Sequence, residues 1–165
     1  LDLTPETLAA LEAAARRSDT KRRGASMASG RMLSKKELTS RLTKKGASPE
    51  DAADTADWLE GLGAVDDAAY AGAIARHYGA MGYGPGRVRQ ELHHRGIPKE
   101  LWDEALEQLP PPEEAIRKFL RAKLRGRPLT PEDSRRLAAA LQRRGFAWQD
   151  IRPALNELGQ EIDET

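Results

Sequence analysis

Apolar side chains recur at helical spacing along most of the chain, and the pattern repeats three times. The repeats align on Gly46, Gly96 and Gly145, which are 50 and 49 residues apart. Apolar residues lie eight and four positions before each glycine and one, six, ten and thirteen positions after it. Such a repeat is typical of stacked helical units and predicts an all-α fold. The aligned residues are Leu38, Leu42, Ala47, Ala52, Ala56 and Leu59; Val88, Leu92, Ile97, Trp102, Leu106 and Leu109; and Leu137, Leu141, Phe146, Ile151, Leu155 and Leu158.

Each repeat predicts a basic helix that ends at the glycine in left-handed backbone, followed by a second amphipathic helix. A further helix is expected ahead of each basic helix, at residues 26–32, 67–81 and 112–125. We therefore expect an elongated, curved array of three tandem three-helix repeats with an extra N-terminal helix. The helix start signals are Ser34 with Glu37, Pro85, Thr130-Pro131 with Asp133, Ser48-Pro49, and Pro98.

The N-terminal part lies outside the repeats. The stretch TPETLAALEAAARR predicts the extra helix, whereas SDTKRRGASMASG is small, polar and basic and predicts a flexible linker. The expected domains are residues 1–25 for the N-terminal helix and flexible linker, 26–63, 64–110 and 111–160 for the three repeats, and 161–165 for a tail.

The stretch GYGPG at residues 82–86 allows two interpretations, a phosphate-binding loop or helix punctuation. A nucleotide loop normally follows a strand and contains a lysine, and neither feature is found here. The segment also occupies the junction between helices that is not glycine-rich in the other repeats. We favour punctuation, with Gly82 ending one helix and Pro85 starting the next.

Composition narrows the chemistry. The chain has no cysteine, which excludes disulfides and thiolate metal sites. His93 and His94 are adjacent, so they point to different sides of a helix and cannot chelate one metal ion. No apolar run approaches the roughly 18 residues that span a bilayer. We therefore expect a soluble cytoplasmic protein that is not an enzyme and uses no metal or cofactor.

The small net charge of +1 conceals a strong segregation. The basic helices carry +4, +2 and +8 over residues 34–46, 84–96 and 115–145, and the segments after them carry −7, −5 and −4 over residues 47–67, 97–114 and 146–165. Helix dipoles favour cations near the C-terminal ends of helices, which accounts for Lys45, Arg95 and Arg144 beside the glycines. Helix dipoles do not account for the other cations. We therefore expect a basic surface that binds either a polyanion or the acidic groove of a partner protein.

Helix geometry selects the candidate binding residues. A step of about 100° per residue sends the outward cations of the first and third repeats away from the buried leucines. Arg87 and Arg89 lie near a helix start, where the helix dipole disfavours cations. Of two explanations for their position, we slightly favour pairing with acidic residues of a neighbouring helix over contact with a partner. Arg117, Lys118 and Arg121 are added because they belong to a basic run, on a helix whose outward face the pattern does not fix. The candidates are Lys36, Lys44, Arg87, Arg89, Arg117, Lys118, Arg121, Arg135 and Arg143.

Three motifs carry a resemblance to a known family. They are Ser34-x-x-Glu37-Leu38 up to Gly46; Trp58-Leu59-x-x-Leu62-Gly63-x-x-Asp66-Asp67-x-x-Tyr70-Ala71; and Gly82-Tyr83-Gly84-Pro85-x-Arg87-Val88-Arg89-Gln90-Glu91-Leu92 up to Gly96-Ile97. Together they resemble the RecX family of bacterial regulators of the RecA recombinase, over roughly residues 26–160. The resemblance implies a protein of DNA repair, recombination and the SOS response that lies in the RecA filament groove. It also implies inhibition of filament growth, ATP hydrolysis, strand exchange and coprotease activity.

Two functions remain open from the residues. The leading hypothesis is a RecA filament modulator, expected to be a monomer without membrane contact. The alternative is an autonomous, sequence-nonspecific binder of single- or double-stranded DNA that acts by competing for DNA. No base-reading motif is visible, so any DNA affinity is expected to be weak.

The repeat also predicts molecular dimensions. An extended array should have a radius of gyration larger than the roughly 15 Å of a compact domain of this length. Small-angle X-ray scattering measures this quantity directly, and a value near that of a compact sphere would exclude the filament-groove hypothesis.

Overall fold

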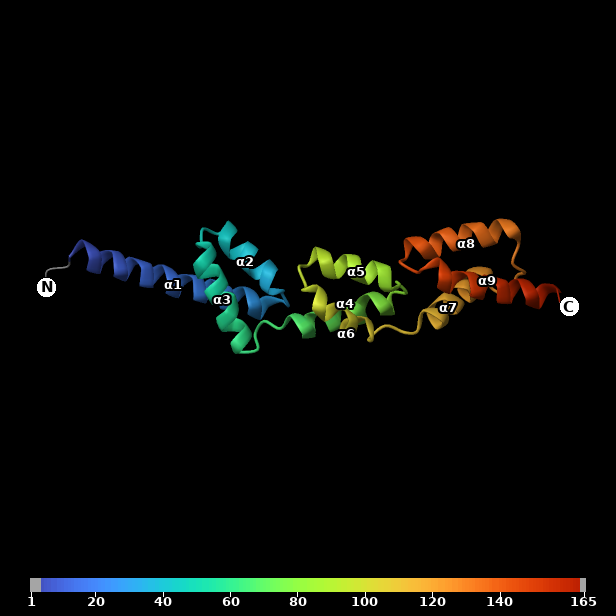
Figure 1. Cartoon of the computed structure of the whole chain (residues 1–165), viewed down its shortest axis with the longest axis horizontal. Coiled ribbons are helices and arrows are strands. Elements are labelled where there is room, and N and C mark those ends of the chain that lie inside the picture. The colour runs from blue at the N-terminus through green and yellow to red at the C-terminus, as the bar shows by residue number, and fades with distance from the viewer. Residues whose placement is uncertain (1–3, 164–165) are drawn as a thin grey trace. The chain divides into compact units, whose positions relative to one another are not determined.

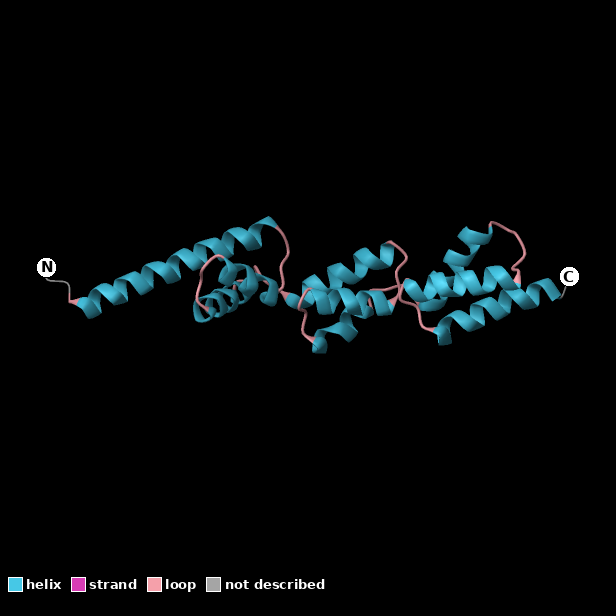
Figure 2. Cartoon of the chain, turned by 90° about the horizontal axis from the view of Figure 1, so that it is seen from above, coloured by secondary structure: helices cyan, strands magenta, loops and turns pink. Residues whose placement is uncertain are grey.

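The fold is all-α throughout the described part of the chain. The computed structural model describes residues 4–163, which form nine α-helices and one short 3₁₀ helix and contain no strand (Figures 1 and 2). The chain divides into two compact units: residues up to 70 together with 95–98, and residues 71–94 together with the chain from residue 99 onward. Among the described helices, none combines the length and hydropathy needed to span a membrane.

The first unit packs three helices and the start of a fourth, α4 (Asp67–Ala80), around one core. These helices are α1 (Pro5–Gly30), α2 (Lys35–Lys44) and α3 (Pro49–Gly61). Ser34 begins α2 through the predicted capping box with Glu37. The repeat-aligned residues fill this core as expected, apart from Ala47, which is half-buried. The buried members are Leu38, Leu42, Ala52, Ala56 and Leu59.

The predicted flexible linker is wrong, because α1 continues through it to Gly30. Tertiary packing explains the difference. Thr20 and Gly24 are buried, and a Cβ added at Gly24 would lie 2.5 Å from the Thr55 Cγ2 atom of α3. The glycine therefore gives α1 its close approach to α3, and the predicted short helix at 26–32 is the end of this longer one. The first half of α1, ahead of Thr20, is almost entirely exposed.

The second unit contains the remaining helices. They are most of α4, α5 (Pro85–His94), a 3₁₀ turn (Lys99–Leu101), α6 (Trp102–Leu106), α7 (Pro112–Leu124), α8 (Pro131–Arg143) and α9 (Trp148–Asp163). Its largest cluster of buried side chains joins α7, α8 and α9 through Ile116, Leu120, Leu124, Leu137, Leu141, Phe146, Ile151 and Leu155. The helix expected after Gly96 is much shorter than predicted, since the 3₁₀ turn precedes it and a run of three prolines follows.

The glycines at 82–86 serve a close contact between two backbones of the second unit. Gly82 has a φ of 85° after α4 and Pro85 begins α5, so the punctuation interpretation is confirmed. In addition, the Gly84 N–H donates to the Arg144 carbonyl at 2.8 Å and the Gly86 N–H to the Gly145 carbonyl at 2.9 Å. We call this contact the glycine joint. A Cβ on Gly84 would lie 2.8 Å from the Gly145 carbonyl oxygen, which no larger residue tolerates without a shift.

An equivalent contact occurs within the first unit. Ser34 and Arg95 align with Gly84 and Arg144 in the repeat, and the Ser34 hydroxyl donates to the Arg95 carbonyl at 2.5 Å. Next to it, the Lys35 N–H donates to the Asp67 carboxylate at 3.0 Å. Burial raises the pKa of that carboxyl above its ordinary value, because it removes water from the charged form. Its neighbour Asp66 accepts from the Ala69 N–H and so caps the start of α4.

Replacing Gly145 tests the glycine joint. This residue has a φ of 97°, and an added Cβ would lie 2.3 Å from the Arg87 backbone nitrogen. Gly145→Ala should lower the free energy of unfolding, measured by urea denaturation, by about 2 kcal/mol or more. Gly126→Ala is the matched control, because Gly126 has a φ of 80° but open space around it. Gly126→Ala should lower the free energy of unfolding by only about 1 kcal/mol, which is the cost of placing alanine in left-handed backbone. Equal losses in the two variants would contradict the close contact.

Candidate partner-binding surface

The predicted binding residues lie on four helices. Lys36 and Lys44 are exposed on α2 of the first unit. The other seven belong to the second unit and are exposed, except for the half-buried Arg87. These are Arg87 and Arg89 on α5; Arg117, Lys118 and Arg121 on α7; and Arg135 and Arg143 on α8.

Arg117 differs from its neighbours on α7 because it has an acidic partner. Its Nε lies 3.2 Å from a carboxylate oxygen of Glu157 on α9. Both side chains are about half exposed, so water screens the pair and the expected stabilisation is below about 1 kcal/mol. Arg117 therefore joins α7 to α9, whereas Lys118 and Arg121 are exposed on the same helix.

Arg87 stacks on aromatic rings. Its guanidinium carbon lies 5.8 Å from the ring centroid of Tyr78 and 5.5 Å from that of Tyr83. The Nε atom is buried and has no hydrogen-bond partner among the described residues. The favoured interpretation, pairing with an acidic side chain of a neighbouring helix, is wrong for Arg87. For Arg89 the side chain is exposed beside the glycine joint.

Arg144 has a similar environment on the other side of Tyr83. Its guanidinium carbon lies 5.4 Å from the Tyr83 centroid and 5.2 Å from that of Phe119. One of its terminal nitrogens also donates to the Met81 carbonyl at 3.2 Å. The two arginines thus alternate with three rings, Tyr78, Tyr83 and Phe119, and cation–π contacts stabilise both guanidinium groups.

A hollow of about 440 Å³ opens beside these groups, and we call it the cationic hollow. It brings four cations together with no acidic residue in its lining. Sequence analysis selected only two of them, Arg87 and Arg143. The helix dipole accounts for Arg144 without a binding role, and Lys123 lies in the basic segment 115–145 but is not among the predicted binding residues. The lining residues are Tyr83, Arg87, Phe119, Lys123, Ala140, Arg143 and Arg144.

A neighbouring hollow of about 420 Å³ extends the basic surface over the glycine joint. It shares Arg87 and Arg143 with the cationic hollow and adds Arg89. Asp150 is the one acidic residue in its lining. Arg87, Arg89 and Arg143 therefore lie together where α5 meets the end of α8.

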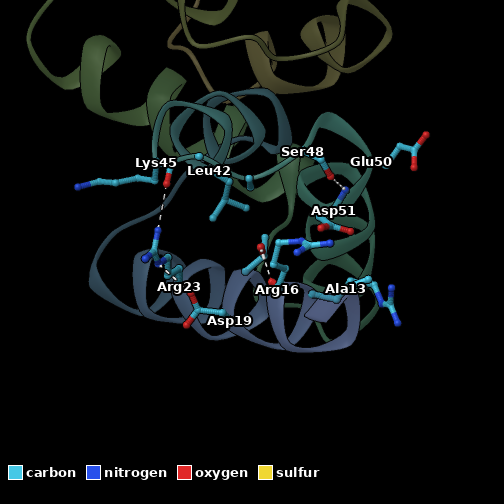
Figure 3. A pocket seen from close by; sticks show the side chains of 13 residues that line it. Ala13, Arg16, Asp19, Arg23, Leu42, Lys45, Ser48, Glu50 and Asp51 are labelled. Carbon is cyan, nitrogen blue, oxygen red and sulfur yellow. Dashed lines mark hydrogen bonds and ion pairs between the residues drawn. The ribbon is translucent and has the colours of Figure 1, made fainter. Parts of the chain in front are cut away.

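The first unit contains a larger pocket, of about 620 Å³, with a different charge pattern (Figure 3). Arg23 projects from α1 and donates to the Lys45 carbonyl at 3.1 Å, and it also lies 3.6 Å from the Asp19 carboxylate. Glu50 and Asp51 add acidic groups to the lining. Because the cations of this pocket are accompanied by acids, it suits a polyanion less well than the cationic hollow does.

The chemistry available at the cationic hollow is anion binding. A guanidinium stacked on rings keeps its N–H groups in one plane, and this arrangement matches carboxylate or phosphate oxygens. Neighbouring cations without an acid repel one another, so an external anion would relieve that repulsion. Within residues 4–163 no group of three or more histidine and acidic side chains is arranged to hold a metal ion.

Fold and surface together define an all-α repeat protein with hollows lined by several cations. Two family models match this chain. The model of the second three-helix domain of RecX matches residues 66–106, and that of the third matches residues 112–155. The regulatory protein RecX of Pseudomonas putida is 32% identical, covering 78% of this chain and 82% of the relative. That of Xanthomonas axonopodis pv. citri is 35% identical, covering 73% and 76%. The chain belongs to the RecX family of regulatory proteins.

Solved structures agree on the fold. A crystal structure of regulatory protein RecX superposes with a TM-score of 0.78 at 24% identity, covering 92% of this chain and 77% of that one. RecX from Lactobacillus salivarius superposes with a TM-score of 0.73 at 17% identity, covering 89% and 99%. These likenesses confirm the predicted all-α architecture of three-helix repeats.

Truncating the two adjacent arginines separates structural from surface roles. Arg144→Ala removes contacts with two rings and a hydrogen bond, so it should lower the free energy of unfolding by about 1–2 kcal/mol. Arg143→Ala removes an exposed side chain and should change it by less than about 0.5 kcal/mol. Thermal or urea denaturation measures both, and equal effects would show that the ring contacts of Arg144 contribute no stability.

Proposed function

We propose that this protein regulates the RecA recombinase, acting as an inhibitor that binds along the groove of the RecA–DNA filament. The observation that carries the proposal is the family membership, supported by matches over two of the three-helix domains. In this proposal the protein acts in the cytoplasm as a monomer, without catalysis of its own. Its effects extend to filament growth, ATP hydrolysis, strand exchange and the coprotease activity of the SOS response.

The exposed cations support contact with an acidic or nucleic-acid surface. Lys36 and Lys44 lie on one helix of the first unit, and Arg135 and Arg143 lie on the aligned helix of the second. Equivalent positions in the first and third repeats would present similar side chains to a partner that is itself repetitive. A filament of identical subunits is such a partner.

A second candidate function is direct binding of DNA, with RecA affected through competition. The observation that favours it is the concentration of unpaired cations around the glycine joint. Binding through several phosphates releases counterions, so the affinity should fall steeply with salt. A contact with a protein groove should depend less on salt. Titration of affinity against salt, with and without RecA, separates the two functions.

Replacing the outward cations of both helices tests the RecA proposal. The fourfold variant Lys36→Ala, Lys44→Ala, Arg135→Ala and Arg143→Ala alters exposed side chains only. Each change should alter stability by less than about 0.5 kcal/mol, so the far-UV spectrum and melting temperature should stay close to those of the parent. Inhibition of the DNA-stimulated ATPase and of strand exchange by RecA should fall.

A comparison variant, Arg117→Ala, Lys118→Ala and Arg121→Ala, alters the basic face of α7. Loss of inhibition in this variant alone would show that α7, and not α2 and α8, meets the filament. Full inhibition by both variants would mean that the partner is held by apolar contacts. If the parent protein leaves both RecA activities unchanged at stoichiometric excess, the proposed function is wrong.

A further inference from the structure

An apolar hollow adjoins the cationic hollow in the second unit. It has a volume of about 430 Å³ and shares Phe119 and Arg144 with its neighbour. The two hollows are therefore adjacent, with Phe119 and Arg144 as their common wall, and we call the pair the groove. The rest of the apolar half comes from the end of α4 and from α7, namely Gly79, Ala80, Met81, Gly82, Pro110, Glu114, Ala115, Lys118 and Ala122.

The apolar half can receive a large apolar side chain. Met81 is a large hydrophobic residue that is 50% exposed there, and the small residues Ala115 and Ala122 leave room along α7. Gly79 forms part of the base, since a Cβ on it would lie 2.9 Å from the Leu109 side chain. Pockets of this size are typical of sites that take up drug-sized apolar groups.

The cationic half provides fixed positive charge directly beside it. Arg144 is held between two rings and bound to the Met81 carbonyl, so it stands at the boundary of both halves. Arg87, Arg143 and Lys123 complete the set, with no acid in the lining. The buried Nε of Arg87 has no acceptor among the described residues, which adds to the unmatched positive charge.

We propose that this groove binds a short acidic segment of a partner protein that carries a large apolar side chain. The apolar side chain enters the half lined by Met81, and carboxylates beside it pair with Arg144, Arg87 and Lys123. Carboxylates fit the planar edge of a stacked guanidinium, and apolar burial next to them supplies affinity that charge alone does not. A nucleic-acid strand fits less well, because the lining of the apolar half, apart from Glu114, Lys118 and Arg144, offers a base no side-chain hydrogen-bonding group.

The test is fluorescence anisotropy with the full chain and no RecA. The probe is a labelled peptide of aspartates and glutamates around a central phenylalanine. We expect saturable binding, weakened by about tenfold or more when phenylalanine is replaced by alanine or the acids by their amides. Because these changes are in the peptide, a folding defect of the protein cannot imitate them. The assay is independent of RecA, so its outcome is distinguishable from that of the proposed function.

Charge reversal locates the binding. Lys123→Glu with Arg143→Glu changes two residues that line the cationic hollow, on α7 and α8. Arg121→Glu with Arg135→Glu makes the same charge change on the same helices at exposed positions outside both hollows. We expect the first pair to weaken peptide binding by about tenfold more than the second.

Three outcomes would overturn the proposal. The first is equal weakening by both pairs of substitutions, which would indicate general electrostatic attraction. The second is indifference to the central phenylalanine, which would leave the apolar half without a ligand. The third is displacement of the peptide by a labelled oligothymidylate that binds more tightly and depends on the same residues, which would assign the groove to nucleic acid.

Discussion

The close approach of two backbones at the glycine joint is the constraint on which the second unit depends. One N–H group just before α5 and one in its first turn reach carbonyls at the end of α8, at 2.8 and 2.9 Å. Side chains at Gly84 or Gly145 would occupy the space that these bonds need. The joint therefore fixes the start of one helix against the end of another, and it brings Arg87 next to Arg143 and Arg144.

Placing these cations together has an energetic cost that stacking offsets in part. Like charges at short range repel, and in this hollow no carboxylate accompanies them. Tyr78, Tyr83 and Phe119 present ring faces to the guanidinium groups, and each such contact stabilises a cation by about 0.5–1 kcal/mol or more where water is excluded. The rings thus make a concentrated positive charge compatible with folding, while the outer edges of the cations remain available to a ligand.

Sequence was informative wherever a local rule governed the structure. Most of the aligned leucines are buried, while Leu106, Leu109 and Leu158 are half-buried. Gly46, Gly96 and Gly145 have positive φ, because left-handed caps, like the helical period, depend on nearby residues. Three features required knowledge of distant residues. Gly24 suggests a linker until Thr55 is seen against it, Arg87 suggests an ion pair until two tyrosines are seen beside it, and Arg144 suggests a helix-dipole cation until its contacts with Tyr83 and Phe119 are known.

The glycine joint and the equivalent contact in the first unit differ in how their charges are paired. In the first unit Lys35 meets Asp57 at 2.7 Å and Glu60 at 3.2 Å, and the hydrogen bond with Asp57 is the main cause that raises the pKa of the lysine. Asp67 accepts from the same residue's backbone, so cation and acids are matched there. In the second unit, glycines replace the polar side chains and no acid lines the cationic hollow. The cations that line the hollow of the second unit are therefore not matched by acids in the way that Lys35 is matched in the first unit.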